Sequence, residues 1–179
     1  EGWTYGESAN TPVLSGNIAG GEVTYLYTGD GYSSDKAPTD AGKYTLTVTV
    51  AETQNYKGGT AECTFTVEKA TAEVPEVEDK IYTGGHLDSG LAGTDLYTVE
   101  EDNGGTEQGE YTVTLKLKDA ANYKWASGDE DGDGVLTLTY KIAKTQNEWT
   151  EEVSIEGWTY GEVRRRHGGR GVQTRGRGG

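Results

Sequence analysis

Methionine is absent from this sequence, cysteine occurs once, and arginine is missing from the first 163 residues. Because not even position 1 is Met, we expect these 179 residues to be a segment of a longer polypeptide. A single cysteine excludes a disulfide within the chain, but it does not fix the compartment, since extracellular proteins can do without disulfides. No run of 18 apolar residues occurs, so we predict no membrane insertion.

Proline is scarce, with three residues, and no stretch of useful length shows the apolar spacing of an amphipathic helix. Thr, Tyr, Val and Gly are plentiful instead. β-branched and aromatic side chains pack well on the surface of a sheet, and glycine serves the turns between strands. The composition therefore predicts the all-β fold class.

One stretch organises the chain, because it occurs twice. Residues 42–57 read GKYTLTVTVAETQNYK, and residues 109–124, at an offset of 67, read GEYTVTLKLKDAANYK. Apolar and polar side chains alternate in both copies, which is the period of a half-buried strand. Two copies predict two tandem modules, which we place at residues 1–70 and 71–147.

Each module is expected to hold further short strands. We place them at residues 23–27, 61–68, 74–77, 80–83, 96–99 and 135–142. The last strand of each module should lie beside the repeated strand, in a small β-sandwich (Ig-like) or a β-grasp-like topology, between which propensity does not choose. In the second module this strand comes eight residues later than the offset requires, which places an insertion in the hairpin around Trp125. Residues 69–71, without Gly or Pro, are predicted to be a short, stiff linker.

The heptapeptide EGWTYGE opens the chain at residues 1–7 and returns at residues 156–162. The full repeat is therefore two modules long. Residues 148–162 are predicted to be the first strand or strands of a further, truncated copy of the first module.

The net charge of −14 is unevenly divided, because all six arginines lie in the last sixteen residues. Without them the rest of the chain carries −20, and so acidic a surface disfavours nucleic acid as a partner of the modules. Residues 163–179 resemble an RGG-type nucleic-acid-binding tail; alternatively they are an out-of-frame translation, because they interrupt the recurring module directly after GWTYGE. Under either hypothesis this tail cannot form a core and is predicted to be disordered.

Three aspartates in the predicted hairpin, Asp129, Asp131 and Asp133, precede Gly134 and match the D-x-D-x-D-G opening of an EF-hand calcium loop. The twelfth position of that loop is Tyr140 instead of the bidentate Glu that closes it. Two hypotheses follow: the aspartates hold calcium, or they form a solvated acidic loop kept open by charge repulsion. The missing Glu favours the second.

Aromatic residues offer a second candidate site. Trp3 and Trp158 occupy the same position of the repeated module and are expected to pack beneath a strand. Tyr123 and Trp125 lie in the hairpin that carries the insertion, and two arrangements are open for them. They pack on the edge of the module, or they form an exposed pair that contacts a glycan.

The residues that could support catalysis are few. Cys63 shares its parity with Phe65 and Val67 on a predicted strand, so we expect it to be buried and chemically inert. His86 is the one histidine before the arginine-rich tail, and the sequence holds no G-x-S-x-G motif. We therefore predict no catalytic residues, and no cofactor apart from the calcium considered above.

Four motifs together resemble the Ig-like repeat modules of bacterial surface proteins, in particular the MBG type with a Tyr-Gly motif. They are GWTYGE at the module start, the PTDAGKYTLTVTV strand, the NYKGG turn and the closing TFTVEKA. The resemblance covers about residues 1–162. It implies a secreted or wall-attached bacterial protein in which such modules extend or present another domain, and it brings no catalytic residues.

Repetition and resemblance predict a non-catalytic structural or adhesive module, a stalk or spacer, of an extracellular bacterial protein. Its expected partners are neighbouring repeat modules of the same polypeptide. The alternative is a module that binds a host or matrix glycan or protein through Trp125 and the acidic hairpin.

Overall fold

The computed structural model describes residues 1–15, 20–29 and 31–148. The chain divides into two units, Glu1–Thr145 and Gln146–Gly179. The second unit lies almost entirely outside the described residues. The partial repeat predicted at residues 148–162 lies outside them too, apart from residue 148, and so does the predicted tail of residues 163–179. The described residues contain strands and no helix, so the predicted all-β class is confirmed.

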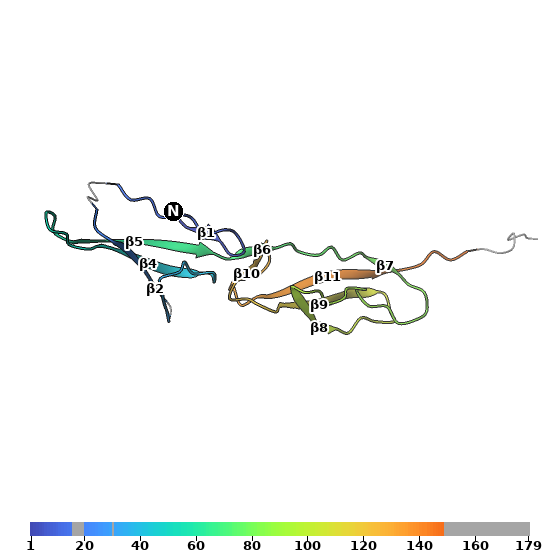
Figure 1. The fold of residues 1–179 in the computed structure, drawn as a ribbon. Coiled ribbons are helices and arrows are strands. Elements are labelled where there is room, and N and C mark those ends of the chain that lie inside the picture. Colours follow the sequence, from blue (N-terminus) through green and yellow to red (C-terminus); the bar gives the residue numbers. More distant parts are fainter. Residues whose placement is uncertain (16–19, 30, 149–179) are drawn as a thin grey trace, which may run out of the picture. The chain divides into compact units, whose positions relative to one another are not determined.

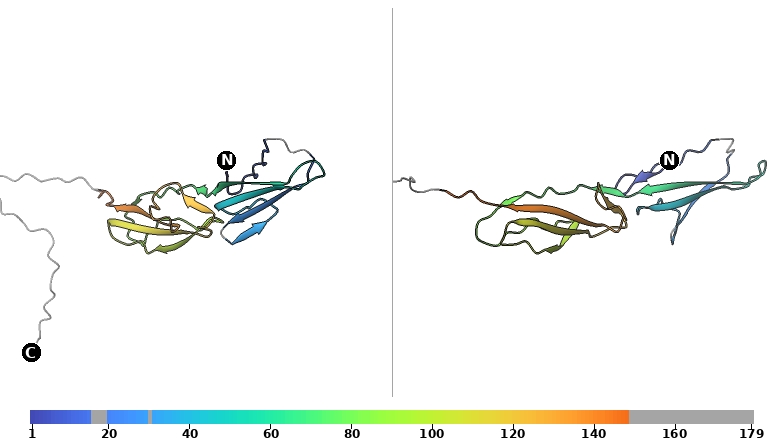
Figure 2. Two further views of the ribbon diagram at one scale, coloured as in Figure 1. Left: turned by 90° about the vertical axis from the view of Figure 1, so that its left-hand side faces the viewer. Right: turned by 180° about the vertical axis from the view of Figure 1, so that it is seen from behind.

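The N-terminal part of the first unit builds a five-stranded sheet, drawn in blue to green in Figures 1 and 2. Its strands are β1 (Trp3–Thr4), β2 (Val23–Gly29), β3 (Tyr32–Ser34), β4 (Gly42–Val50) and β5 (Gly59–Glu68). They are ordered β1-β5-β4-β2-β3, with β1 parallel to β5 and the other pairs antiparallel. We call this sheet the first sheet.

The C-terminal part builds a four-stranded sheet, called the second sheet, and a separate strand pair. Its strands are β6 (Ala70–Ala72), β7 (Lys80–Ile81), β8 (Tyr97–Asp102), β9 (Gly109–Leu117), β10 (Tyr123–Trp125) and β11 (Val135–Ala143). The second sheet is ordered β7-β11-β9-β8, with β7 parallel to β11. Strand β6 pairs in parallel with β10, which forms the two-stranded sheet.

The two large sheets share one pairing scheme. In the first, Gly42 at the start of β4 pairs with Val67, and in the second, Gly109 at the start of β9 pairs with Ile142. Residues of β5 therefore correspond to residues 75 positions later in β11, whereas β4 corresponds to β9 at the offset of 67. The difference of eight confirms the predicted insertion between the repeated strand and the last strand.

Alternation along the repeated strands is also confirmed. Tyr44, Leu46 and Val48 of β4 are buried, and so are Val113, Leu115 and Leu117 of β9. Their intervening residues face the other side, because successive side chains of a strand point to opposite faces. Strands β4 and β9 each lie beside the last strand of their half, as predicted.

Several short elements differ from the prediction. No strand forms at residues 74–77, and residues 69–71 are not a plain linker, because β6 begins at Ala70. Strand β8 continues to Asp102, three residues beyond the predicted end at residue 99. Strand β3 forms at Tyr32–Ser34, where no strand was predicted. Elements of two or three residues are too short to display a period of apolar residues, so local sequence does not predict them. Strand β6 also pairs with β10, which lies about fifty positions away in the sequence.

Each large sheet has its own apolar cluster. The cluster on the second sheet contains Ala72, Tyr97, Val113, Leu115, Leu117, Trp125 and Leu136. The cluster on the first sheet is smaller, with Tyr27, Leu46 and Val48 buried and residues such as Leu14 and Phe65 packed against them at partial burial. The first sheet therefore has the less completely covered face.

Candidate functional site

An open groove with a mixed polar and apolar lining lies over the first sheet. Its volume is about 860 Å³, and it runs between strands β2, β4 and β5 on one side and residues 10–15 on the other. Its apolar lining includes Val13, Leu14, Tyr27, Leu46, Val48, Val50, Ala61 and Phe65. A groove of this size and lining accepts an apolar ligand or the side chains of a polypeptide segment.

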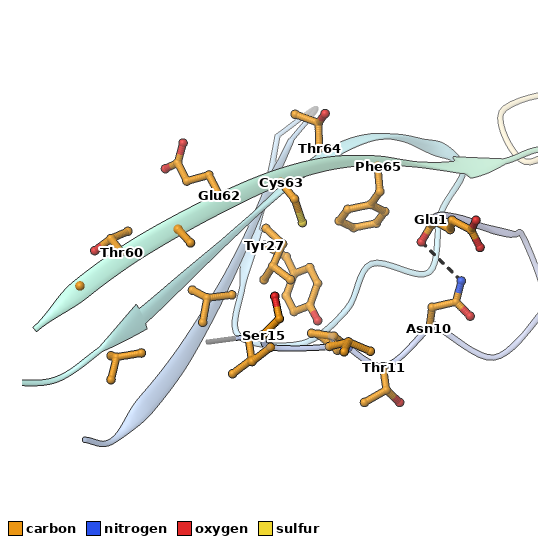
Figure 3. Close-up of a pocket in the computed structure, with 18 of the residues that line it drawn as sticks. Glu1, Asn10, Thr11, Ser15, Tyr27, Thr60, Glu62, Cys63, Thr64 and Phe65 are labelled. Atoms are coloured by element: carbon orange, nitrogen blue, oxygen red, sulfur yellow. Dashed lines mark hydrogen bonds between the residues drawn. The ribbon is translucent and has the colours of Figure 1, made fainter. Parts of the chain in front are cut away.

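The segment opposite the sheet is held by polar and apolar contacts. The Asn10 side-chain amide donates a hydrogen bond to the carbonyl oxygen of Gly2 at 2.7 Å. It also donates one to the carbonyl oxygen of Glu1 at 3.4 Å, which Figure 3 shows. Leu14 packs against the apolar cluster, whereas its neighbour Val13 is 91% exposed. Burial raises the pKa of Tyr27, which lines the groove from the sheet.

Cys63 lines this groove and is exposed, so the prediction of a buried cysteine was wrong. The predicted parity is nevertheless right. Cys63 and Phe65 point into the groove, while Glu62 and Thr64 point away from it (Figure 3). The exposure arises because no second layer covers this part of the sheet among the described residues.

The exposed aromatic pair considered for the hairpin is not present. Trp125 is 5% exposed and belongs to the cluster of the second sheet, where its indole Nε1 donates to the carbonyl oxygen of Gly134 at 3.0 Å. Tyr123 is partly buried and packs edge-on against Tyr5, with ring centroids 5.4 Å apart. Trp125 therefore cannot stack on a glycan in this structure, because strand β10 turns it inward when it pairs with β6.

The three aspartates of the hairpin do come together. One carboxylate oxygen from each of Asp129, Asp131 and Asp133 lies within 4.8 Å of the others. Two of the three aspartates accept hydrogen bonds from the backbone of the turn. Asp129 accepts hydrogen bonds from the backbone of Gly132 and Gly134, and Asp133 accepts one from the backbone nitrogen of Val135. The carboxylates thus stabilise the loop through backbone N–H groups, as Asp commonly does in turns.

The twelfth position of the calcium-type loop lies inside strand β11. Tyr140 there is 1% exposed, and its hydroxyl donates to Asp102 at 3.1 Å, so it points into the second half of the chain and away from solvent. Burial, followed by the hydrogen bond to Asp102, raises the pKa of Tyr140 to about 12. The fold therefore supplies no closing ligand from this position.

Asp102 collects a buried polar network that the sequence did not reveal. It accepts hydrogen bonds from the Tyr140 hydroxyl and from both the backbone and the side chain of Ser89, which is 4% exposed. The Ser89 oxygen in turn accepts from the backbone nitrogen of Leu91. The Ser89 and Tyr140 donors converge on one carboxylate, so the network holds the loop around Ser89 against strand β8. Its members are up to 51 positions apart in sequence, so no local motif could predict the network.

Comparison with protein-family models, with curated proteins and with solved structures found no match for this chain. Within the part of the chain that the structure describes, no helix is both long and apolar enough to traverse a lipid bilayer.

Proposed function

We propose that the chain consists of tandem Ig-like or β-grasp-like modules that serve as a non-catalytic stalk, spacer or adhesive segment of a bacterial surface or secreted protein. The repeated pairing scheme supports the tandem part of the proposal. The order β1-β5-β4-β2 in the first sheet matches β7-β11-β9-β8 in the second, and the repeated and final strands pair in the same register. Such a match arises most simply when one structural unit is used twice.

One observation carries the proposal: the last strand of the first sheet leads directly into the next part of the fold. Strand β5 ends at Glu68, and β6 begins at Ala70, with Lys69 alone between them. The Lys69 side chain donates to the carbonyl oxygen of Ala120. The connection is therefore hydrogen-bonded on both sides and is not a free linker, which suits a segment that must hold successive modules in order.

Asn122 reinforces this junction from the second half. Its side-chain oxygen accepts a hydrogen bond from the backbone nitrogen of Ala41 at 2.8 Å, and its own carbonyl oxygen accepts one from Ala70 at 2.9 Å. Asn122 is 9% exposed, so these hydrogen bonds are shielded from water. One residue thus joins the loop before β4 to the start of β6.

The localisation and family parts of the proposal rest on the motifs GWTYGE and PTDAGKYTLTVTV and on their resemblance to MBG-type modules. We expect the partners of this chain to be neighbouring repeat modules of the same polypeptide.

Antibodies against the recombinant chain test the surface part of this proposal. On intact cells of the source organism they should label the exterior, and brief treatment with external protease should remove the label. Labelling that appears only after cell lysis would overturn the proposal. The genomic sequence downstream of codon 162 provides a second test, because a continued reading frame of the first module should appear there.

A further inference from the structure

Two different surfaces meet at the junction between the halves. The first half contributes Tyr5, just beyond β1, and Lys69, just beyond β5. The second half contributes the turn that leads into β10, where Tyr123 packs edge-on against Tyr5 with ring centroids 5.4 Å apart. The carbonyl oxygen of Ala120 in this turn accepts a hydrogen bond from the Lys69 side chain. We call the surface of the first half an end surface and that of the second half a turn surface.

Asn122 is the central polar residue of this contact. Its side chain accepts a hydrogen bond from the backbone nitrogen of Ala41 and donates one to the carboxylate of Asp40 at 3.5 Å. Its backbone carbonyl oxygen accepts another from the nitrogen of Ala70. The two surfaces are therefore held by one aromatic contact and by hydrogen bonds from several chain segments.

The second half has an end surface of its own. The backbone nitrogen of Tyr82 donates to the last residue of β11, as that of Tyr5 does to the last residue of β5. These two last residues correspond in the shared register, so Tyr82 is the counterpart of Tyr5, and Lys144 is the counterpart of Lys69. Tyr82 and Lys144 are exposed, whereas Tyr5 and Lys69 are partly buried.

The loop before each repeated strand agrees with this assignment. The Tyr44 hydroxyl donates to the carbonyl oxygen of Asp40, and the Tyr111 hydroxyl donates to that of Glu107, at 3.0 Å in both cases. Glu107 and Gln108 therefore take the places of Asp40 and its neighbour. Both are exposed.

The first half likewise has a turn surface of its own. Residues 51–58 join β4 to β5 at the end of the first sheet away from the junction (Figure 1). At the offset of 67, Asn55 corresponds to Asn122, and Tyr56 corresponds to Tyr123. Asn122 is 9% exposed and Tyr123 is partly buried, whereas Tyr56 is 51% exposed and Asn55 is exposed. The residues that the junction shelters in the second half are thus open in the first.

Residue types agree at the contact positions although neighbouring positions differ. The two tyrosines, the lysine and the asparagine of the junction recur as tyrosines, lysine and asparagine on the exposed surfaces. By contrast, Thr4 corresponds to Ile81, and Ala121 corresponds to Gln54. The exposed end surface and the exposed turn surface therefore carry the side chains of a contact that the structure already forms.

We propose that the end surface of the second half binds the turn surface of the first half of a second copy of this chain, by the contacts of the junction. Tyr82 packs against Tyr56 of the second copy. The Lys144 side chain donates to the carbonyl oxygen of Thr53, and the Asn55 side chain bonds to the loop before β9. Each of these contacts repeats one that the junction makes within the chain.

The contact joins unlike surfaces, so it is heterologous and adds copies head to tail. It deepens the proposed function by giving the surfaces through which successive modules meet, and it rests on that proposal only in treating the two halves as copies of one module. So small a contact is weak between separate chains. Within one polypeptide, an effective concentration on the order of millimolar favours it.

Nuclear magnetic resonance measures weak association between intact chains. The full chain, isotope-labelled and dilute, is mixed with unlabelled full chain at concentrations that rise into the millimolar range. The amide signals of Tyr56 and Tyr82 should shift along one saturation curve. The signals of their counterparts, Tyr123 and Tyr5, should stay in place, because these two rings are already in contact within the chain.

Substitutions in the unlabelled chain alone reveal the direction of the contact. Tyr82→Ser should weaken binding at the labelled Tyr56 about tenfold, because it removes the ring that packs there, and should leave the shift of the labelled Tyr82 unchanged. Tyr56→Ser should do the reverse. Ile81→Ser, at a neighbouring position that is 64% exposed, should change neither shift. The spectrum of each variant reports whether it is folded.

The absence of a concentration-dependent shift in the millimolar range, or shifts confined to other surfaces, would overturn the proposal. If Tyr82→Ser removes the shift of the labelled Tyr82, like surfaces pair with each other, and the head-to-tail assignment is wrong. Antibody labelling of cells does not depend on this contact, so either proposal can fail without the other.

Discussion

At the scale of single residues, Trp125 shows how pairing decides the role of a side chain. The indole is buried in the cluster of the second sheet, and its N–H donates to the carbonyl of Gly134, so both its apolar and its polar parts are satisfied. Gly134 itself has a positive φ of 81°, and a Cβ there would lie 2.6 Å from that of Ala120. The loop end beneath Trp125 is therefore restricted to glycine.

Replacing Trp125 by Ala should lower the free energy of unfolding by about 3–5 kcal/mol, because a large buried side chain leaves a cavity. Urea denaturation followed by circular dichroism would measure the loss. Ile81→Ala is the control, since Ile81 is 64% exposed and should change stability by no more than about 0.5 kcal/mol. A loss for Trp125→Ala as small as that of the control would show that the indole is not a core residue.

Tyr140 gives the second half of the chain a predictable response to alkaline pH. Its pKa is raised to about 12 in the folded chain by burial and then by the hydrogen bond to Asp102. Between about pH 10, the ordinary tyrosine value, and pH 12, the unfolded chain loses the proton while the folded chain keeps it. The stabilisation that Tyr140 contributes to the folded chain is therefore complete below about pH 10 and is lost as the pH rises toward 12. Over that range the free energy of unfolding should fall by at most about 1.4 kcal/mol per pH unit.

Tyr140→Phe should remove that slope. Denaturant unfolding at several pH values between 9 and 12 would compare the variant with the parent chain. Tyr82→Phe, at an exposed position, should leave the parent slope intact and serves as the control. Identical slopes in the parent and in Tyr140→Phe would contradict the assignment.

The sequence predicted which face of a strand each residue occupies, but it did not predict whether that face is buried. Alternation placed Cys63 and Phe65 on one face correctly, because it depends only on the geometry of one strand. Whether that face is buried depends on a second layer supplied by distant residues. The same limit explains Trp125, whose burial requires the pairing of β10 with β6.

At the scale of elements, the junction between the halves is a paired strand. Strand β6 lies parallel to β10, Lys69 donates to Ala120, and Ala72 is buried. Cleavage by a protease requires a segment to open and extend, and hydrogen-bonded, buried backbone opens rarely. The junction is thus expected to be more resistant than the exposed turns on either side.

Limited trypsin digestion should therefore cut after Lys57, in the exposed turn before β5, and after Lys144, beyond β11, before it cuts after Lys69. Mass spectrometry of early fragments would give the order. Asn122→Ala removes the acceptor for the Ala41 nitrogen and should accelerate cleavage after Lys69, with a loss of about 1–3 kcal/mol if that donor stays unpaired. Early cleavage after Lys69 in the parent chain would contradict the paired junction.

In the acidic hairpin, Asp129 and Asp133 already accept hydrogen bonds from the hairpin's own backbone. We expect no calcium-specific rise in Tm, because Tyr140 replaces the closing Glu and is buried in β11. Exposed carboxylates should respond to ionic strength alone, so calcium and magnesium at matched ionic strength should act alike. A rise of several degrees with calcium only, lost in Asp131→Asn, would contradict this expectation.

Long strands were predictable because nine or ten residues display the two-residue period several times. Strands β4, β5, β9 and β11 appear where alternation placed them, within about two residues, which is the usual uncertainty of strand ends. Strands β3, β6 and β10 have three residues each and show no period. Their formation depends on partners brought by the fold, so propensity alone cannot locate them.

At the scale of the whole described structure, the two halves share a pairing scheme but have unequal cores. The second sheet carries a cluster of seven buried residues, and the first carries three. Apolar burial contributes most of the stability of a small domain. The first half should therefore open at lower free energy, even though junction hydrogen bonds connect it to the second.

Native-state hydrogen exchange should show this gradient: amides of β4 and β5 should exchange faster than the corresponding amides of β9 and β11. The corresponding strands provide an internal control, since they share register and length. Equal protection in both halves would mean that the junction makes the halves one cooperative unit, in which the smaller core is stabilised by its neighbour.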